Sequence, residues 1–126
     1  MKTNKDPRHL DRIRVMQQLF AWAFDPEGKV EERDERLPKT LAIIGKLADI
    51  DPEIVEAAPE RPLIDVNQID LAVLRQAIYE LIRSKDVPVK VVVDEAVEIG
   101  KEFGTDTSGS FINGVLGKVI EKHKLA

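Results

Sequence analysis

The amino-acid sequence predicts an all-α protein. Apolar residues recur at three- and four-residue spacing through most of the chain, and proline residues stand where several of these patterns begin. The one stretch that would suit a β-strand has no second stretch to pair with. The chain of 126 residues is of single-domain length, so we expect one domain over residues 1–126 with about six or seven helices.

The first expected helix begins at Asp6-Pro7, because aspartate caps a helix well and proline is tolerated at its first position. Arg8 and Arg12 are four residues apart and are therefore expected to share a face of this helix. Met16 and Trp22 are expected in the core. The apolar stripe that defines the helix runs as far as Asp25-Pro26 and comprises Leu10, Ile13, Met16, Phe20, Ala23 and Phe24.

The stretch from Asp25 to Pro62 has a less regular pattern. Its charged first part predicts a loop or a frayed helix start, and Pro38 is a suitable first residue for a helix that extends to Ala48. Asp51-Pro52 repeats the cap-plus-proline signature and predicts a short helix, which the later prolines end.

The most regular helical pattern extends from Val66 to Ser84, and its wide apolar face predicts burial between several neighbouring helices. Pro88 is expected to begin the next helix, which ends at Gly104. The three valines after Pro88 would also suit a strand, but helical spacing continues beyond them without a break. Thr107 or Ser108 is expected to cap the last helix.

Asn113-Gly114 is a strong turn signal, yet it lies inside the apolar pattern of the last predicted helix. Glycine costs about 1 kcal/mol relative to alanine inside a helix, and it is tolerated where a neighbouring helix approaches closely. We therefore expect this pair to mark a tight helix crossing. A loop that ends in a left-handed residue is the alternative.

Composition excludes several classes of protein. With 43% hydrophobic and 33% charged residues the chain resembles an ordinary globular protein, and no run approaches the roughly 18 apolar residues of a membrane span. The polar start of the chain does not resemble a signal peptide, so a cytoplasmic location is expected. There is no cysteine, and neither histidine has metal-ligand spacing. Without a nucleophile–base pair or a phosphate loop, we expect no enzyme, cofactor or metal site.

Two features concern the charged residues. Residues 1–15 contain five basic and two acidic side chains, whereas residues 16–80 contain seven basic and fourteen acidic ones. This polarity predicts a basic end that attracts an anionic partner and an acidic body that attracts a basic one. Asp94, Glu95 and Glu98 are expected to be a solvated helix start that complements the helix dipole.

The C-terminal part of the chain resembles the NusB family of bacterial transcription antitermination factors. Five local patterns carry the resemblance, in the order and at the spacing of the family: LRQAIYEL (Leu74–Leu81), DVP (Asp86–Pro88), DEAVE (Asp94–Glu98), FGTDTS (Phe103–Ser108) and FINGVL (Phe111–Leu116). The stretch RIRVMQQLFAW (Arg12–Trp22) also resembles the first helix of the family, whereas the stretch from Asp25 to Pro62 does not match residue by residue.

The resemblance implies an all-helical fold in two subdomains and a non-catalytic function. It implies binding of boxA-like single-stranded RNA in ribosomal RNA leader transcripts, together with a small-subunit ribosomal protein that acts as NusE. The candidate RNA-binding residues are Lys2, Lys5, Arg8, His9, Arg12, Arg75 and Phe111. Asp70 and Glu80 are the candidate partner contacts. Either a monomer or a homodimer fits the sequence.

Alternatives remain open at several positions. In place of an RNA contact, Arg75 could form an ion pair with Glu80 or Asp70. In the same way, Phe111 could be simply the first core residue of its helix. Uncharged or acidic residues at Leu10, Asp11, Thr107 and Ser110 depart from the charge pattern of the family. These departures also fit a helical protein-interaction module with little RNA specificity, or a stand-alone relative of the N-terminal RNA-binding domain of a ribosomal RNA cytosine methyltransferase.

Overall fold

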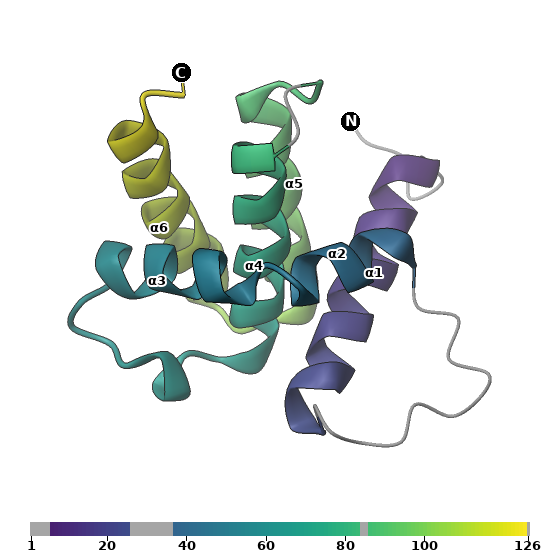
Figure 1. Ribbon diagram of the computed structural model, residues 1–126, viewed down its shortest axis with the longest axis horizontal. Coiled ribbons are helices and arrows are strands. Elements are labelled where there is room, and N and C mark those ends of the chain that lie inside the picture. Colours follow the sequence, from purple (N-terminus) through teal and green to yellow (C-terminus); the bar gives the residue numbers. More distant parts are fainter. Residues whose placement is uncertain (1–5, 26–36, 84–85, 126) are drawn as a thin grey trace.

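The computed structural model describes residues 6–25, 37–83 and 86–125, and within these ranges it contains α-helices, one short 3-10 helix and no strand (Figure 1). The elements in chain order are α1 (Pro7–Phe24), α2 (Pro38–Ile44), α3 (Leu47–Ala57), η1 (Leu63–Asp65), α4 (Gln68–Arg83), α5 (Val89–Phe103) and α6 (Ser108–His123). The predicted all-α fold is therefore confirmed. Among the described helices, none combines the length and the apolar character that crossing a membrane requires.

Helix α4 is the centre of the fold. All of its residues from Asp70 to Ile78 are buried, and it packs against α1, α2, α3, α5 and α6. Helices α4, α5 and α6 lie beside one another. In the view of Figure 1, α3 crosses in front of α6 and α4, and α2 crosses in front of α1. The N-terminal pair α1–α2 and the C-terminal pair α5–α6 thus share α4, and one hydrophobic core extends through both groups.

The start of α3 differs from the prediction. Helix α3 begins at Leu47, so Pro52 lies inside the helix and does not open it. Proline at this position cannot donate to the carbonyl group of Ala48, but both residues are exposed and water can bond that carbonyl. Ile50 and Ile54 lie on either side of Pro52 and are both buried. Their burial explains why the helix continues through the proline.

The predicted tight crossing at Asn113-Gly114 is wrong. Both residues are exposed within a continuous α6, and a Cβ atom added to Gly114 would have no neighbour within 4 Å. Gly104, which follows the last residue of α5, is confined instead by its own stretch of chain: an added Cβ would lie 2.7 Å from the carbonyl oxygen of Gly100 and would also overlap the Ser108 side chain. Trp22 is also not a core residue, because it is only half-buried, whereas Met16 is fully buried as predicted.

These two glycines provide a matched pair of substitutions. Gly114→Ala should raise the free energy of unfolding by about 1 kcal/mol, because it improves helix propensity and meets no neighbour. Gly104→Ala should lower it by about 1–3 kcal/mol, since the added methyl group overlaps backbone and side-chain atoms. Urea unfolding followed by circular dichroism measures both effects. A loss of stability in Gly114→Ala would show that this face of α6 is covered.

Candidate nucleic-acid interface

The N-terminus of α1 presents one of the predicted RNA-binding residues to solvent. Asp6 caps the helix by accepting a hydrogen bond of 2.9 Å from the backbone N–H of Arg8, and this bond holds the pKa of Asp6 below its usual value. The Arg8 side chain is 84% exposed, and its Nε lies 3.5 Å from Asp6 Oδ1. Its guanidinium is therefore available to an external anion.

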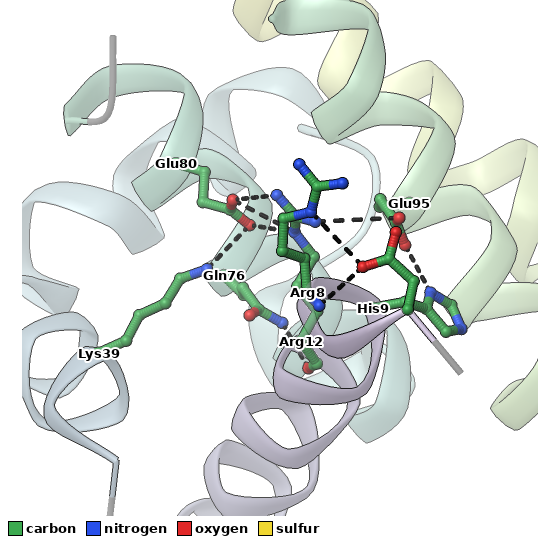
Figure 2. Close-up of polar contacts among 8 residues, drawn as sticks. Arg8, His9, Arg12, Lys39, Gln76, Glu80 and Glu95 are labelled. Atoms are coloured by element: carbon green, nitrogen blue, oxygen red, sulfur yellow. Dashed lines mark hydrogen bonds and ion pairs between the residues drawn. The ribbon is translucent and has the colours of Figure 1, made fainter. Parts of the chain in front are cut away.

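His9 follows directly but points into the protein. The residue is fully buried, and its Nδ1 lies 2.6 Å from Oε2 of Glu95, which belongs to α5 (Figure 2). Glu95 was expected in a solvated helix start, and that expectation is wrong because this carboxylate is buried against His9. The pair joins the first turn of α1 to α5.

Arg12 is also buried, one turn further along α1. Its Nη2 and Nε donate to the two carboxylate oxygens of Glu80 on α4, at 2.8 and 3.1 Å. Its backbone carbonyl accepts a hydrogen bond of 2.9 Å from the side-chain amide of Gln76, and Lys39 of α2 lies 3.1 Å from Glu80 (Figure 2). A second carboxylate, that of Glu95, lies 3.9 Å from Arg12 Nη1. We refer to His9, Arg12, Lys39, Glu80 and Glu95 as the α1 ion-pair network.

Burial acts on the two cations of this network in the same direction but with different outcomes. For Arg12, burial lowers the pKa, but the hydrogen bonds and the charge of Glu80 outweigh it, so the pKa is raised. For Lys39, burial is the larger effect and the pKa is lowered despite the attraction of Glu80. Arg12 binds Glu80 through hydrogen bonds to both carboxylate oxygens, whereas Lys39 contacts one of them.

A group of possible metal ligands overlaps this network. His9, Glu95 and Glu98 bring one ligand atom each within 4.8 Å of the others. His9 already bonds Glu95, and the Arg12 guanidinium provides positive charge beside the same carboxylate. We therefore assign His9 and Glu95 to this network and not to a metal site.

The helical repeat explains why Arg8 and Arg12 do not share an environment. The buried residues of α1 include His9, Arg12, Met16 and Leu19, which recur at intervals of three and four positions. Arg12 thus belongs to this row of buried residues, whereas Arg8 lies one position before its first member, His9. Arg8 and Arg12 share a side of α1, as their spacing of four predicts, but Arg12 is buried against Glu80 and only Arg8 is exposed, so the two do not form a common basic surface.

Arg75 forms an ion pair inside the chain, but with a different partner from the two that were expected. Its Nε and Nη2 donate to the carboxylate oxygens of Asp51 on α3, at 3.0 and 2.9 Å. Asp70 and Glu80 are each five residues from Arg75 and therefore lie about 140° around α4 from it. Asp51 lies on the neighbouring helix that Arg75 faces. The guanidinium also lies 5.9 Å from the centre of the Trp22 ring.

The first turn of α6 contains Phe111, the aromatic residue that is predicted to contact RNA. Phe111 is half-buried and packs against the hydrophobic core, and the guanidinium carbon of Arg61 lies 4.3 Å above the centre of its ring. Asp70 lies in the same region and is only 3% exposed. Among the described residues, its Oδ1 has no hydrogen-bond partner. Burial raises the pKa of Asp70, against the opposing effects of Ser108 and Arg61.

Comparison with known proteins decides the family. Residues 16–121 match the sequence model of the NusB family. The chain belongs to the NusB family. A structure of T. maritima NusB superimposes with a TM-score of 0.82 at 31% identity, covering 97% of this chain and 94% of that one. The Transcription antitermination protein NusB of Psychromonas ingrahamii is 34% identical over 139 aligned positions, which cover 99% of this chain and 95% of the relative.

A further relative matches more closely over a shorter stretch. The NusB protein of Tolumonas auensis is 56% identical over 62 residues, and the chain spans 45% of its length there. Proteins of the NusB family are antitermination factors and not catalysts, which agrees with the expectation that this chain is not an enzyme.

The structure separates the predicted NusB contacts by accessibility. Of the RNA-binding candidates, Arg8 is exposed and Phe111 is half-buried, whereas the other described members are buried in ion pairs. Both predicted partner contacts, Asp70 and Glu80, are buried. Lys2 and Lys5 lie outside the described residues. Among the candidates that the structure describes, the accessible ones thus lie at the start of α1 and the start of α6.

Arg12 and Arg8 allow a test of this division. Arg12→Ala should lower the free energy of unfolding by about 2–4 kcal/mol, because it leaves Glu80 buried with one partner fewer. Arg8→Ala removes the same charge from an exposed site and should change stability by less than about 0.5 kcal/mol. Urea denaturation at neutral pH measures both. Equal effects of the two substitutions would contradict the structural role of Arg12.

Asp70→Asn tests the cost of the buried carboxylate. The pKa of Asp70 is raised above its ordinary value of 3.8 in the folded chain, so folding favours the protonated form. The resulting stability is complete below about pH 3.8 and is lost as the pH rises through the folded-state pKa. At pH 7 the neutral amide should therefore stabilise the fold by about 1 kcal/mol. Thermal unfolding between pH 7 and pH 4 should show this gain shrinking; a loss of stability at pH 7 would mean that the carboxylate has a partner.

Proposed function

We propose that this chain is a transcription antitermination factor that binds boxA-like single-stranded RNA of ribosomal RNA leader transcripts. In this proposal it acts together with a small-subunit ribosomal protein in the role of NusE. Membership of the NusB family supports the general function. The observation that carries the RNA contact is the exposed guanidinium of Arg8 at the capped start of α1.

The start of α1 suits phosphate binding for two physical reasons. Arg8 belongs to the basic segment of residues 1–15, in which Lys2 and Lys5 precede it. The positive end of the helix dipole also lies at this terminus and adds to the attraction of an anion. Asp6 reduces this attraction, because its carboxylate lies 3.5 Å from Arg8 Nε.

His9 and Arg12 have an indirect role in this proposal. Their ion pairs with Glu95 and Glu80 hold the first two turns of α1 against α5 and α4. Because the helix is rigid over this distance, these contacts also set the direction in which Arg8 projects. Both residues are therefore positioning residues for the RNA contact.

The acidic body of the chain suits a basic ribosomal protein. Residues 16–80 contain twice as many acidic as basic side chains, and opposite charges steer two proteins together. Since Asp70 and Glu80 are buried, we assign the partner contact to exposed acidic residues of the same part of the chain. Asp49, Glu60 and Asp65 are examples.

A second function has support from the burial of three candidate RNA-binding side chains. His9, Arg12 and Arg75 are paired within the chain, and the uncharged Leu10 is 43% exposed among the basic positions. A helical protein-interaction module that retains the ribosomal-protein contact but has little RNA specificity would have these properties. RNA selectivity separates this function from the first one.

The test is RNA affinity across a salt series, with boxA-like and scrambled single strands, in the presence and absence of the ribosomal partner. We expect the boxA-like strand to bind at least tenfold more tightly when the partner is present. Arg8→Ala should weaken binding several-fold and reduce the slope of log affinity against log salt by about 0.7, because one phosphate contact is lost.

Arg14→Ala is the matched control for Arg8→Ala. Arg14 is exposed on the same helix but lies six residues further on, about 120° around the axis. Its loss should leave the salt slope nearly unchanged. Equal and weak binding to both strands, unaffected by the partner, would reject the antitermination function in favour of the protein-interaction module.

A further inference from the structure

We infer that Arg61 is a further RNA-contact residue, which forms with Phe111 a stacking site for an unpaired base. This inference rests on the proposed RNA-binding function. It assigns a role to a residue that the sequence patterns do not single out, since Arg61 lies in the segment without a residue-by-residue family match. The position of the Arg61 side chain, the exposure of Phe111 and the charges around them support this role.

The backbone around Arg61 is held in place. The residue lies in the connection between α3 and η1, where its N–H donates a hydrogen bond of 3.1 Å to the carbonyl oxygen of Ala58. Pro59 and Pro62 flank it, and each proline restricts its own φ to about −65°. The side chain is nevertheless exposed. A long cationic side chain is thus presented from a turn with little conformational freedom.

Phe111 is anchored from the other side. Its backbone N–H donates a hydrogen bond of 3.0 Å to the carbonyl oxygen of Thr107 in the first turn of α6. Part of its ring packs against the core, which fixes the ring, and part of the side chain remains accessible. The guanidinium carbon of Arg61 lies 4.3 Å above the ring centre, within the range of a cation–π contact.

An aromatic ring covered by a guanidinium is a surface to which a nucleic-acid base adds readily. Unpaired bases of RNA stack on aromatic side chains and on arginine planes, and every base has a face that can do so. A base can extend the Arg61–Phe111 stack or take the place of the guanidinium on the ring. In the second case Arg61 is free to bond the adjacent phosphate.

The surrounding charges favour stacking over long-range attraction. Lys101 is exposed beside the start of α6, where its side chain extends along Gly109. Exposed acidic residues, Glu60 and Asp106, are near in sequence to Arg61 and Phe111 and offset this charge. Because the patch has little excess of positive charge, its contribution to RNA affinity should be mostly independent of salt.

The experiment uses short RNA strands, boxA-like and scrambled, that carry the fluorescent base 2-aminopurine at successive positions. Stacking quenches this fluorophore, so the position that meets Phe111 should lose fluorescence on binding. Arg61→Ala should remove most of the quenching and weaken binding about five- to tenfold, while the salt slope changes by no more than that of one phosphate contact. Phe111→Leu should have the same effect on quenching.

Arg83→Ala is the control for the lost charge. Arg83 is a partly exposed arginine in the last turn of α4. Arg61 lies near Asp70, which is about 20 Å from Arg83 along the same helix. It should leave the quenching unchanged. Far-ultraviolet circular dichroism checks that the variants are folded. We expect Arg61→Ala to fold, because it removes an exposed side chain.

The outcomes separate this inference from the proposed function. Selective boxA binding without any quenching that depends on Arg61 would overturn the stacking site and leave antitermination standing. Quenching that depends on both residues in either strand would support the stacking site, even if the boxA-like strand had no advantage and the proposed function failed. Quenching that persists in Arg61→Ala but not in Phe111→Leu would also overturn the role of Arg61.

Discussion

The bidentate ion pair between Arg12 and Glu80 is the contact on which the orientation of α1 depends. Glu80 belongs to α4, which packs against every other α-helix in the described part of the chain. Removing two charges from water is costly, and the cost is offset only where each charge finds well-placed partners. Lys39 provides such a partner for Glu80, and Gln76 holds the same turn of α1 through the backbone carbonyl of Arg12. The arrangement thus selects one orientation of α1 in place of the many that an apolar contact would allow.

Arginine has two distinct uses in this molecule, and helical position decides between them. Arg12 and Arg75 each donate two N–H groups to both oxygens of one carboxylate, fully buried at Glu80 and partly buried at Asp51, a geometry that lysine cannot provide. Arg8 and Arg61 instead extend into solvent, one at a helix start and one in a proline-flanked turn. The buried pairs hold the helices from which exposed groups act, so that stability and recognition are assigned to neighbouring but separate residues.

The helices whose first residues carry local signals could be predicted from the sequence, and so could the all-α class. Asp6-Pro7, Pro38 and Pro88 mark their helices because capping and the missing proline N–H act within one turn. The start of α3 could not be predicted in this way, since the burial of Ile50 and Ile54 by distant helices outweighs the effect of Pro52. The same limit applies to the candidate site. That Arg75 would meet a carboxylate followed from its buried position, but only the packing of α3 on α4 identifies Asp51 as that carboxylate.

The exposed Asn113-Gly114 pair has a consequence for the chemical ageing of the protein. In flexible chains the backbone nitrogen of such a glycine attacks the asparagine side chain, ammonia is lost, and a cyclic imide opens to aspartate or isoaspartate. Glycine permits this reaction because it has no side chain to hinder the attack, but the continuous helix α6 holds that nitrogen away from the amide carbon. Deamidation of Asn113 therefore requires local opening of the helix. The rate at which isoaspartate accumulates would report how often α6 opens in an otherwise folded protein.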